Sequence, residues 1–310
     1  MRKISKYRML ENRAICTLLI VMLMFLSGCR VAELPDDIDK VTAETAEVIL
    51  DESPVILSGS IGGEFALKGL VESGTEIDTE LIEDYYTNLS QTVKAKKGIL
   101  SERRYTEYAR ASIGLLAIGK DPQNVEEYDL IEPLDNYSGV NNQGINAESY
   151  AVLVARMAGV KLANEDKYVD NIINDIKRAH KEKPEKYSDY VAIELLGLSL
   201  VDGRDKEISE AVQLAEEYLS ECQRDDGSMG NSDSTSITII GLIQTGTDIF
   251  KDERFIKNGN TLADGLMKYQ LKDGGFGYMD AEEYNQMSTE SALLALDAIK
   301  KSTKGHRLYE

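Results

Sequence analysis

The chain has 310 residues, of which 42% are hydrophobic and 29% are charged, and its formal net charge is −19. This composition excludes a largely disordered chain and predicts one or two domains with a sizeable core. The acidic balance disfavours binding to nucleic acid, because the phosphates of the backbone would be repelled.

The first 28 residues have the order of a bacterial lipoprotein signal peptide. A basic start, MRKISKYRMLENR, precedes the apolar run AICTLLIVMLMFL, which is too short to span a bilayer comfortably. The stretch Leu26-Ser27-Gly28-Cys29 then has the form of a lipobox, in which small residues precede the cysteine that receives lipid. We therefore expect cleavage before Cys29, a diacylated N-terminus, and a protein held on the membrane outside the cytoplasm.

Residues 42–302 repeat one pattern about six times. Apolar stretches such as YTEYARASIGLLAIG alternate with amphipathic ones such as DKEISEAVQLAEEYLSECQ. Glycines end the apolar stretches roughly every 40 to 45 residues, at Gly74, Gly119, Gly159, Gly203 and Gly246. Two layers of helices, apolar inside and amphipathic outside, bury such a pattern.

We thus predict an all-α fold of about six helical hairpins that closes as an α/α toroid (α6/α6 barrel), with an open solenoid as the alternative. Residues 29–41 are predicted to form the lipidated cysteine and a tether, and residues 303–310 a C-terminal tail.

Two segments resemble the repeat of terpene cyclases and protein prenyltransferases, in which a glutamine and a glycine follow a leucine or aromatic residue at fixed spacing. In LMKYQLKDGGFGY these positions hold Leu266, Gln270, Gly274 and Phe276, and in YLSECQRDDGSMG they hold Leu219, Gln223, Gly227 and Met229. The resemblance implies that the glutamine ends an outer helix and that the glycine turn leads to the next inner helix. Residues 42–300 are also similar to bacterial surface and secreted proteins with a prenyltransferase-type toroid.

The resemblance raises one candidate catalytic residue. Class II terpene cyclases protonate their substrate with the middle aspartate of an Asp-x-Asp-Asp-Thr-Ala motif. The matching stretch here runs from Asn231 to Ser236, where Asp233 takes the position of the acid and both supporting aspartates are absent. The sequence favours a different interpretation, because Ser, Thr and Asp at a helix start also cap free backbone amides.

No metal or cofactor is predicted. Protein prenyltransferases hold zinc with Asp, Cys and His, whereas Cys222 lies near the end of an outer helix and neither histidine is close to it in sequence.

Carboxylates in the first turns of the inner helices are expected to gather at one mouth of the ring. They are Glu64, Glu107, Glu148, Asp189, Asp233 and Glu290. Two of them could act as general acid and base on a glycan, although acids also favour helix N-termini because the helix dipole is positive there. Arg110 and Arg156 lie in apolar helices, and we expect each to pair with one of these rim carboxylates.

The sequence therefore favours a lipid-anchored binding or scaffolding module at the bacterial cell surface over an enzyme. The sequence does not distinguish among a glycan, a lipid and a surface protein as its ligand. The alternatives are a divergent terpene cyclase that uses Asp233 as its acid and a glycan-processing enzyme that uses two rim carboxylates.

Overall fold

The computed structural model describes residues 37–184 and 186–310, and there it confirms the all-α prediction. This part of the chain forms twelve α-helices and two short 3-10 helices, and it contains no strand. The helices are α2 (Ile38–Glu52), α3 (Glu64–Ser73), α4 (Thr79–Ala95), α5 (Thr106–Ala117), η1 (Glu132–Asp135), α6 (Tyr137–Asn141), α7 (Ile145–Met157), α8 (Glu165–Glu182), α9 (Ser188–Leu198), α10 (Asp205–Cys222), α11 (Ser232–Gln244), η2 (Glu253–Phe255), α12 (Leu262–Met267) and α13 (Gln286–Ser302). The predicted signal peptide and Cys29 lie outside the described residues.

Residues 38–41, which the sequence assigned to the tether, belong to α2. This is a correction, and its reason is the apolar periodicity that starts at Ile38. Ile38 and Val41 pack against the core, and the same face continues to Ala46 and Ile49, which are fully buried. The pattern that makes an amphipathic helix therefore begins before the predicted domain boundary.

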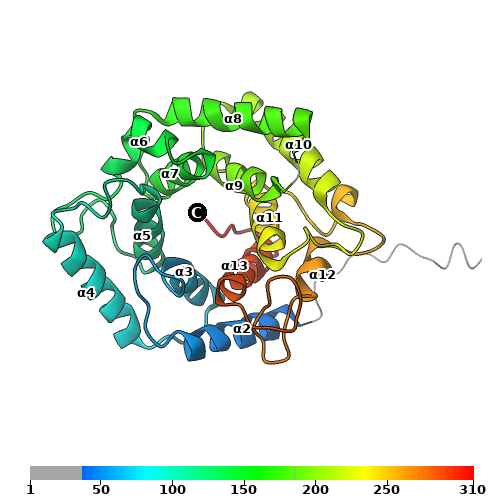
Figure 1. The fold of residues 1–310 in the computed structure, drawn as a ribbon, viewed down its shortest axis with the longest axis horizontal. Helices are drawn as coiled ribbons and strands as arrows, with labels where there is room; N and C mark the ends of the chain where they lie inside the picture. Colours follow the sequence, from blue (N-terminus) through cyan, green and yellow to red (C-terminus); the bar gives the residue numbers. More distant parts are fainter. Residues whose placement is uncertain (1–36, 185) are drawn as a thin grey trace, which may run out of the picture.

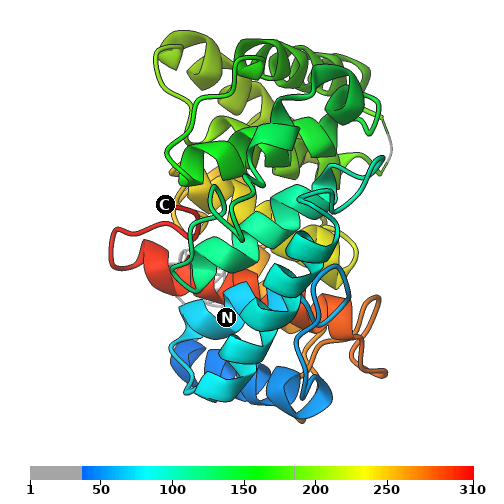
Figure 2. The same ribbon diagram turned by 90° about the vertical axis from the view of Figure 1, so that its left-hand side faces the viewer.

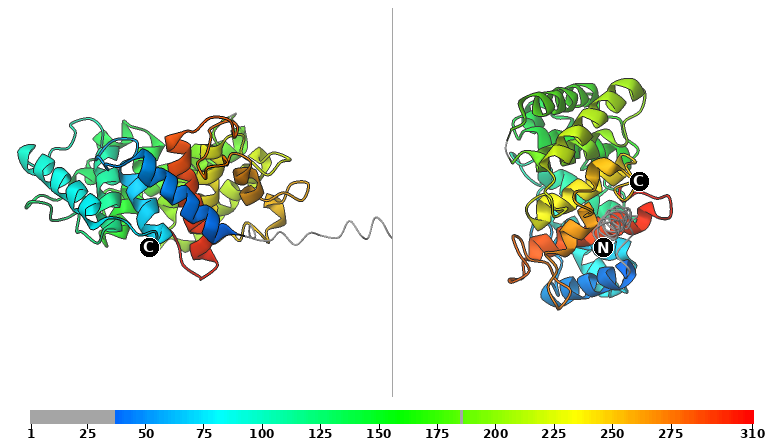
Figure 3. Two further views of the ribbon diagram at one scale, coloured as in Figure 1. Left: turned by 90° about the horizontal axis from the view of Figure 1, so that it is seen from below. Right: turned by 90° about the vertical axis from the view of Figure 1, so that its right-hand side faces the viewer.

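The helices form two layers (Figure 1). The inner layer is a ring of α3, α5, α7, α9, α11 and α13, each packed against the next, and α13 also packs against α3. The outer layer contains α2, α4, α8 and α10, with the shorter α6 and α12. Seen edge-on in Figures 2 and 3, α13 runs through the thickness of the ring and ends on the same face as the C-terminus.

Side-chain burial explains why the two layers alternate along the chain. Eleven of the 13 residues of the inner helix α11 are buried. The outer helix α8 buries one stripe instead, which includes Tyr168, Ile172 and Ile176, and leaves its other face to solvent. A helix that is apolar nearly all round needs neighbours on every side, whereas an amphipathic helix can cover the outside.

The turn after α10 is built by the first glutamine of the repeat. Gln223 follows the last residue of α10, and its Nε2 donates to the carbonyl oxygens of Gly227 and Phe255, both at 3.0 Å. Gly227 has φ +86°, and a Cβ there would lie 2.1 Å from the carbonyl oxygen of Thr261. Glycine is therefore required both for the backbone conformation and for the close approach of the next outer segment.

The second glutamine lies in a comparable turn. Gln270 and Phe276 form an isolated antiparallel bridge, and the side chain of Phe276 is fully buried. The amide of Phe276 donates to Thr289 Oγ1 in α13 at 3.0 Å, so the turn is fixed to the inner helix that follows it. Thr45 in α2 donates to the carbonyl oxygen of Gly274 at 3.0 Å, which joins the first described helix to this last repeat.

Candidate functional site

One mouth of the ring contains a pairing between α3 and α5. Glu64, the first residue of α3, is fully buried, and its Oε1 accepts from Ser58 Oγ at 2.6 Å and from the amide of Gly59 at 2.9 Å. Arg110 of α5 lies 3.3 Å from Glu64 Oε2 and donates to the carbonyl oxygen of Ser60 at 2.8 Å. The two side chains therefore hold the loop before α3 in place, and Arg110 meets one of the carboxylates expected for it.

Glu290 of α13 joins this cluster through the same loop. Its Oε1 accepts from the amide of Gly62 at 2.6 Å, and the residue is only 5% exposed. Burial raises the pKa of the Glu290 carboxyl to about 7, against the opposing effects of the Gly62 amide and of Arg110. Glu290 therefore changes protonation near neutral pH, unlike an ordinary surface glutamate.

Asp233, the candidate acid, does not cap its helix. The N-cap of α11 is Asn231, whose side chain accepts from the amide of Ser234 at 2.8 Å. Asp233 Oδ1 is buried without a hydrogen-bond partner, and burial raises the pKa of the carboxyl, as does the nearby Asp189, while the Ser288 hydroxyl opposes the shift. Asp189 and Asp233 are thus neighbours, and the capping role that the sequence favoured belongs to Asn231.

Two other carboxylates do not join the expected cluster. Glu107 forms an ion pair with Arg104, whose side chain is largely exposed. Glu148 of α7 faces the outer segments instead, because its Oε1 accepts from Asn141 Nδ2 at 2.5 Å and from Asn171 Nδ2 at 3.1 Å. The prediction that all six acids line one rim is therefore wrong. A residue in the first turn of an inner helix lies at that end of the ring, but its side chain can point toward the outer layer instead of the mouth.

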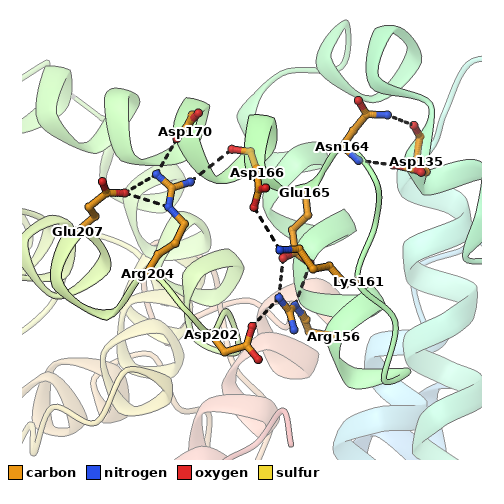
Figure 4. Close-up of polar contacts among 10 residues, drawn as sticks. All are labelled: Asp135, Arg156, Lys161, Asn164, Glu165, Asp166, Asp170, Asp202, Arg204 and Glu207. Carbon is orange, nitrogen blue, oxygen red and sulfur yellow. Dashed lines mark hydrogen bonds and ion pairs between the residues drawn. The ribbon is translucent and has the colours of Figure 1, made fainter.

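Arg156 also departs from expectation, because it pairs with no rim carboxylate. It lies in the last turn of α7, and its Nε and Nη2 donate to Glu165 at 2.8 and 2.6 Å. A further bond of 2.9 Å joins Nη2 to Asp202 (Figure 4). Glu165 opens α8 and is fully buried, so the guanidinium compensates a carboxylate that solvent does not reach.

A cleft of about 630 Å³ lies beside this ion pair. Its lining residues are Lys161, Asp166, Asp170, Asp202, Gly203 and Arg204. Figure 4 shows the ion pairs that cross it: Arg204 bonds to Asp170 at 2.7 Å and to Glu207, and Lys161 lies 3.4 Å from Asp166. All the charged side chains of this cleft already have partners of opposite charge, which gives the cleft a structural role between α8 and α10.

A second cleft, of about 330 Å³, lies at the other end of α7. Its lining residues are Asn141, Gly144, Ile145, Glu148, Asn171, Asn174, Asp175 and Arg178. Asp175 accepts from Arg178 Nη2 at 2.6 Å and from the hydroxyl of Tyr187 at 2.8 Å. Glu148 is 1% exposed, its Oε2 has no partner, and burial raises the pKa of its carboxyl.

Glu194 of α9 lies behind Asp175 and was missed by the sequence analysis. It is fully buried, and burial raises the pKa of its carboxyl to about 10, with a further contribution from Asp175. The pKa of Asp175 is lowered instead, because Arg178 and the Tyr187 hydroxyl donate to its carboxylate and outweigh burial, while both oxygens of the neighbouring Glu194 lack a hydrogen-bond partner. The pair therefore holds one proton on Glu194 at neutral pH. The sequence did contain a signal, because Glu194 lies in the middle of the apolar stretch YVAIELLGL. An ionisable side chain in an apolar helix needs a partner, as was expected for Arg110 and Arg156.

The C-terminal segment lies across the opposite mouth of the ring, where the C-terminus is labelled in Figure 1. Leu308 and Tyr309 are each 1% exposed. The side chain of Gln244, at the end of α11, accepts from the amide of Tyr309 at 3.1 Å and donates to its carbonyl oxygen at 2.5 Å. Lys68 of α3 lies over the Tyr309 ring, 5.5 Å from its centre.

No protein-family model and no curated protein matches this chain. Among residues 37–184 and 186–310, no group of three or more His, Cys, Asp and Glu residues is arranged to hold a metal ion. None of the described helices is long and apolar enough to cross a bilayer.

Cys222 is partly buried, and burial raises the pKa of its thiol. The function must therefore be argued from the side chains themselves.

Proposed function

We propose that the chain is a lipoprotein, anchored outside the cytoplasm through Cys29, whose helical ring is a binding or scaffolding module. We further propose that the ring is an α/α toroid of the terpenoid cyclase and protein prenyltransferase type. The contacts of α13 with α3 and the turns at Gln223 and Gln270 support this fold. The anchor is supported by the order of basic start, apolar run and lipobox in the sequence.

One observation carries the binding role: a segment of peptide is already seated in the ring. Gln244 bonds to both backbone polar groups of Tyr309, and the ring of that residue is fully enclosed. At the other mouth, Glu64 and Arg110 are engaged with each other and with the loop before α3. Groups that hold the protein's own structure are not free to act on a substrate, which favours a binder over an enzyme.

The anchor is tested by replacing the lipidated cysteine. We expect the full-length protein to take up labelled palmitate and to sediment with membranes, and Cys29→Ala to lose the label. Cys16→Ala is the matched control, because Cys16 lies in the predicted signal peptide and should leave labelling unchanged. Labelled lipid on the Cys29→Ala protein would refute the assignment.

The divergent cyclase is the second candidate, and Asp233 is the observation that favours it. Its buried Oδ1 lacks a partner, and burial raises the pKa of its carboxyl, which is the direction of shift that a general acid requires. The binding proposal expects no turnover of polyprenyl substrates by the wild-type protein. Turnover that Asp233→Asn abolishes and that Glu107→Gln preserves would establish the enzyme instead.

A further inference from the structure

The C-terminal segment is held by two kinds of contact. The Gln244 amide recognises the backbone of Tyr309, a contact that does not depend on the identity of the side chain at that position. Enclosure of Leu308 and Tyr309 supplies the side-chain specificity. Backbone bonds together with pockets for particular side chains are the elements by which proteins bind peptide segments.

The charged residues around the Tyr309 side chain remain paired when the C-terminal segment is absent. Lys68 is only 4% exposed, yet it forms an ion pair with Glu72, and Glu72 lies 2.7 Å from Lys301. None of these three residues depends on the C-terminal segment for an opposite charge. Departure of Tyr309 would therefore leave an apolar pocket beside a paired cation, and not a buried unpaired charge.

The segment itself is joined to the ring by little else. α13 ends at Ser302, and Gly305, with φ +79°, reverses the chain. His306 and Glu310 are exposed and bond to each other at 3.1 Å. Only two consecutive side chains are deeply buried, so the segment can leave without unwinding a helix.

We propose that this mouth of the ring is a peptide-binding site for a segment with an aliphatic residue followed by an aromatic one, and that residues 305–310 occupy it in the free protein. The inference rests on the proposed binding function and names the class of its ligand. A partner peptide of this chemistry displaces the segment, so the C-terminus competes with the partner for the ring.

The site is tested on the full-length chain with its own segment released. The variant carries Leu308→Ser and Tyr309→Ser, and the probe is a fluorescent peptide with the sequence GHRLYE. We expect the probe to bind the released variant at least about tenfold more tightly than the wild-type protein, whose site is filled. A probe with alanine in place of tyrosine should bind about tenfold more weakly, as should the natural probe when Gln244→Ala is added to the released variant.

Circular dichroism of each variant separates a lost site from a lost fold. We expect the released variant to keep its helical signal and to regain thermal stability when the probe is added. Equal binding of the two probes, no saturable binding, or unfolding of the released variant would each overturn the inference. Such a failure leaves the anchor and the absence of polyprenyl turnover untouched, whereas turnover by Asp233 would refute the proposed function and not the peptide site.

Discussion

Two clefts at opposite ends of α7 are lined by five and three charged residues and arrange them differently. In the cleft beside Arg156, all the charged lining residues belong to ion pairs. In the cleft beside Glu148, one oxygen of that carboxylate has no partner, and both oxygens of the buried Glu194, whose pKa is raised to about 10, also have none. Besides the number of charged residues, the clefts differ in whether each charge has a partner of opposite sign.

The difference indicates how each cleft contributes to stability. Paired charges next to a buried carboxylate are costly to separate, because the remaining charge stays away from water. Burial raises the pKa of acids that lack such partners, and their contribution to stability varies with pH. One cleft should therefore respond to loss of an arginine and the other to changes in pH.

The largest effect is expected from Arg156→Ala. This change leaves Glu165 buried without its guanidinium, and we expect the free energy of unfolding to fall by about 3 kcal/mol in urea titrations of the full-length protein. Arg204→Ala is the matched control in the same cleft, because its partners Asp170 and Glu207 have side chains 59% and 60% exposed. The control should lose less than about 1 kcal/mol. Equal losses would show that burial of Glu165 does not govern the cleft.

Glu194→Gln should have the next largest effect, which grows as pH rises above 4.5. The folded pKa of about 10 lies above the ordinary glutamate value of 4.5, so the folded state keeps a proton that the unfolded state releases above pH 4.5. Glu194 therefore destabilises the protein increasingly as pH rises between these values. We expect the variant to be more stable than wild type by at least about 1 kcal/mol at pH 8 and equally stable at pH 4.

Glu290→Gln provides the contrast for this prediction. The folded pKa of Glu290 is about 7, lower than that of Glu194. The stability difference between Glu290→Gln and wild type should therefore grow from pH 4.5 and reach a plateau above about pH 7. Thermal unfolding followed by circular dichroism across pH 4 to 9 would distinguish the two carboxyls. An identical pH profile for the two variants would contradict the assignment.

The smallest effect is expected from Arg178→Met. The Arg178 and Asp175 side chains are 41% and 18% exposed, so their ion pair should contribute less than about 1 kcal/mol. The pKa of Asp175 should rise, because one of the groups that lower it has been removed. Carboxyl chemical shifts in an NMR titration would measure this change. A large loss of stability would indicate that Arg178 also holds Glu194 in place.

The alternation of inner and outer helices was predictable because it follows from the local periodicity of apolar residues. The apolar stretch around Ser112 and the amphipathic stretch around Glu217 differ in pattern over a dozen residues, and their helices lie inside and outside accordingly. The glutamine turns were accessible for the same reason, since the residues that form each turn lie within a few positions of one another.

Partners across the fold were not predictable. Arg110 and Arg156 sit in similar apolar sequences, yet one meets Glu64 of the preceding inner helix and the other meets Glu165 of the following outer helix. Which neighbour an arginine reaches depends on its depth along the helix and the direction of its side chain, which periodicity does not specify. The burial of Tyr309 in the ring was not predictable either, because a segment of six residues is too short to show a periodic pattern of apolar residues.

The bonds between the first and last repeats set an order for assembly. Gly62 and Glu290 are 228 residues apart in sequence, and Thr45 and Gly274 are separated by 229. Contacts of such long separation form late and slowly, because the chain between them must already be ordered. During synthesis, α2 and α3 must wait for α13 before their last face is covered. A premature stop or a late proteolytic cut would therefore expose the beginning of the molecule as well as its end, and quality control could detect the defect far from where it arose.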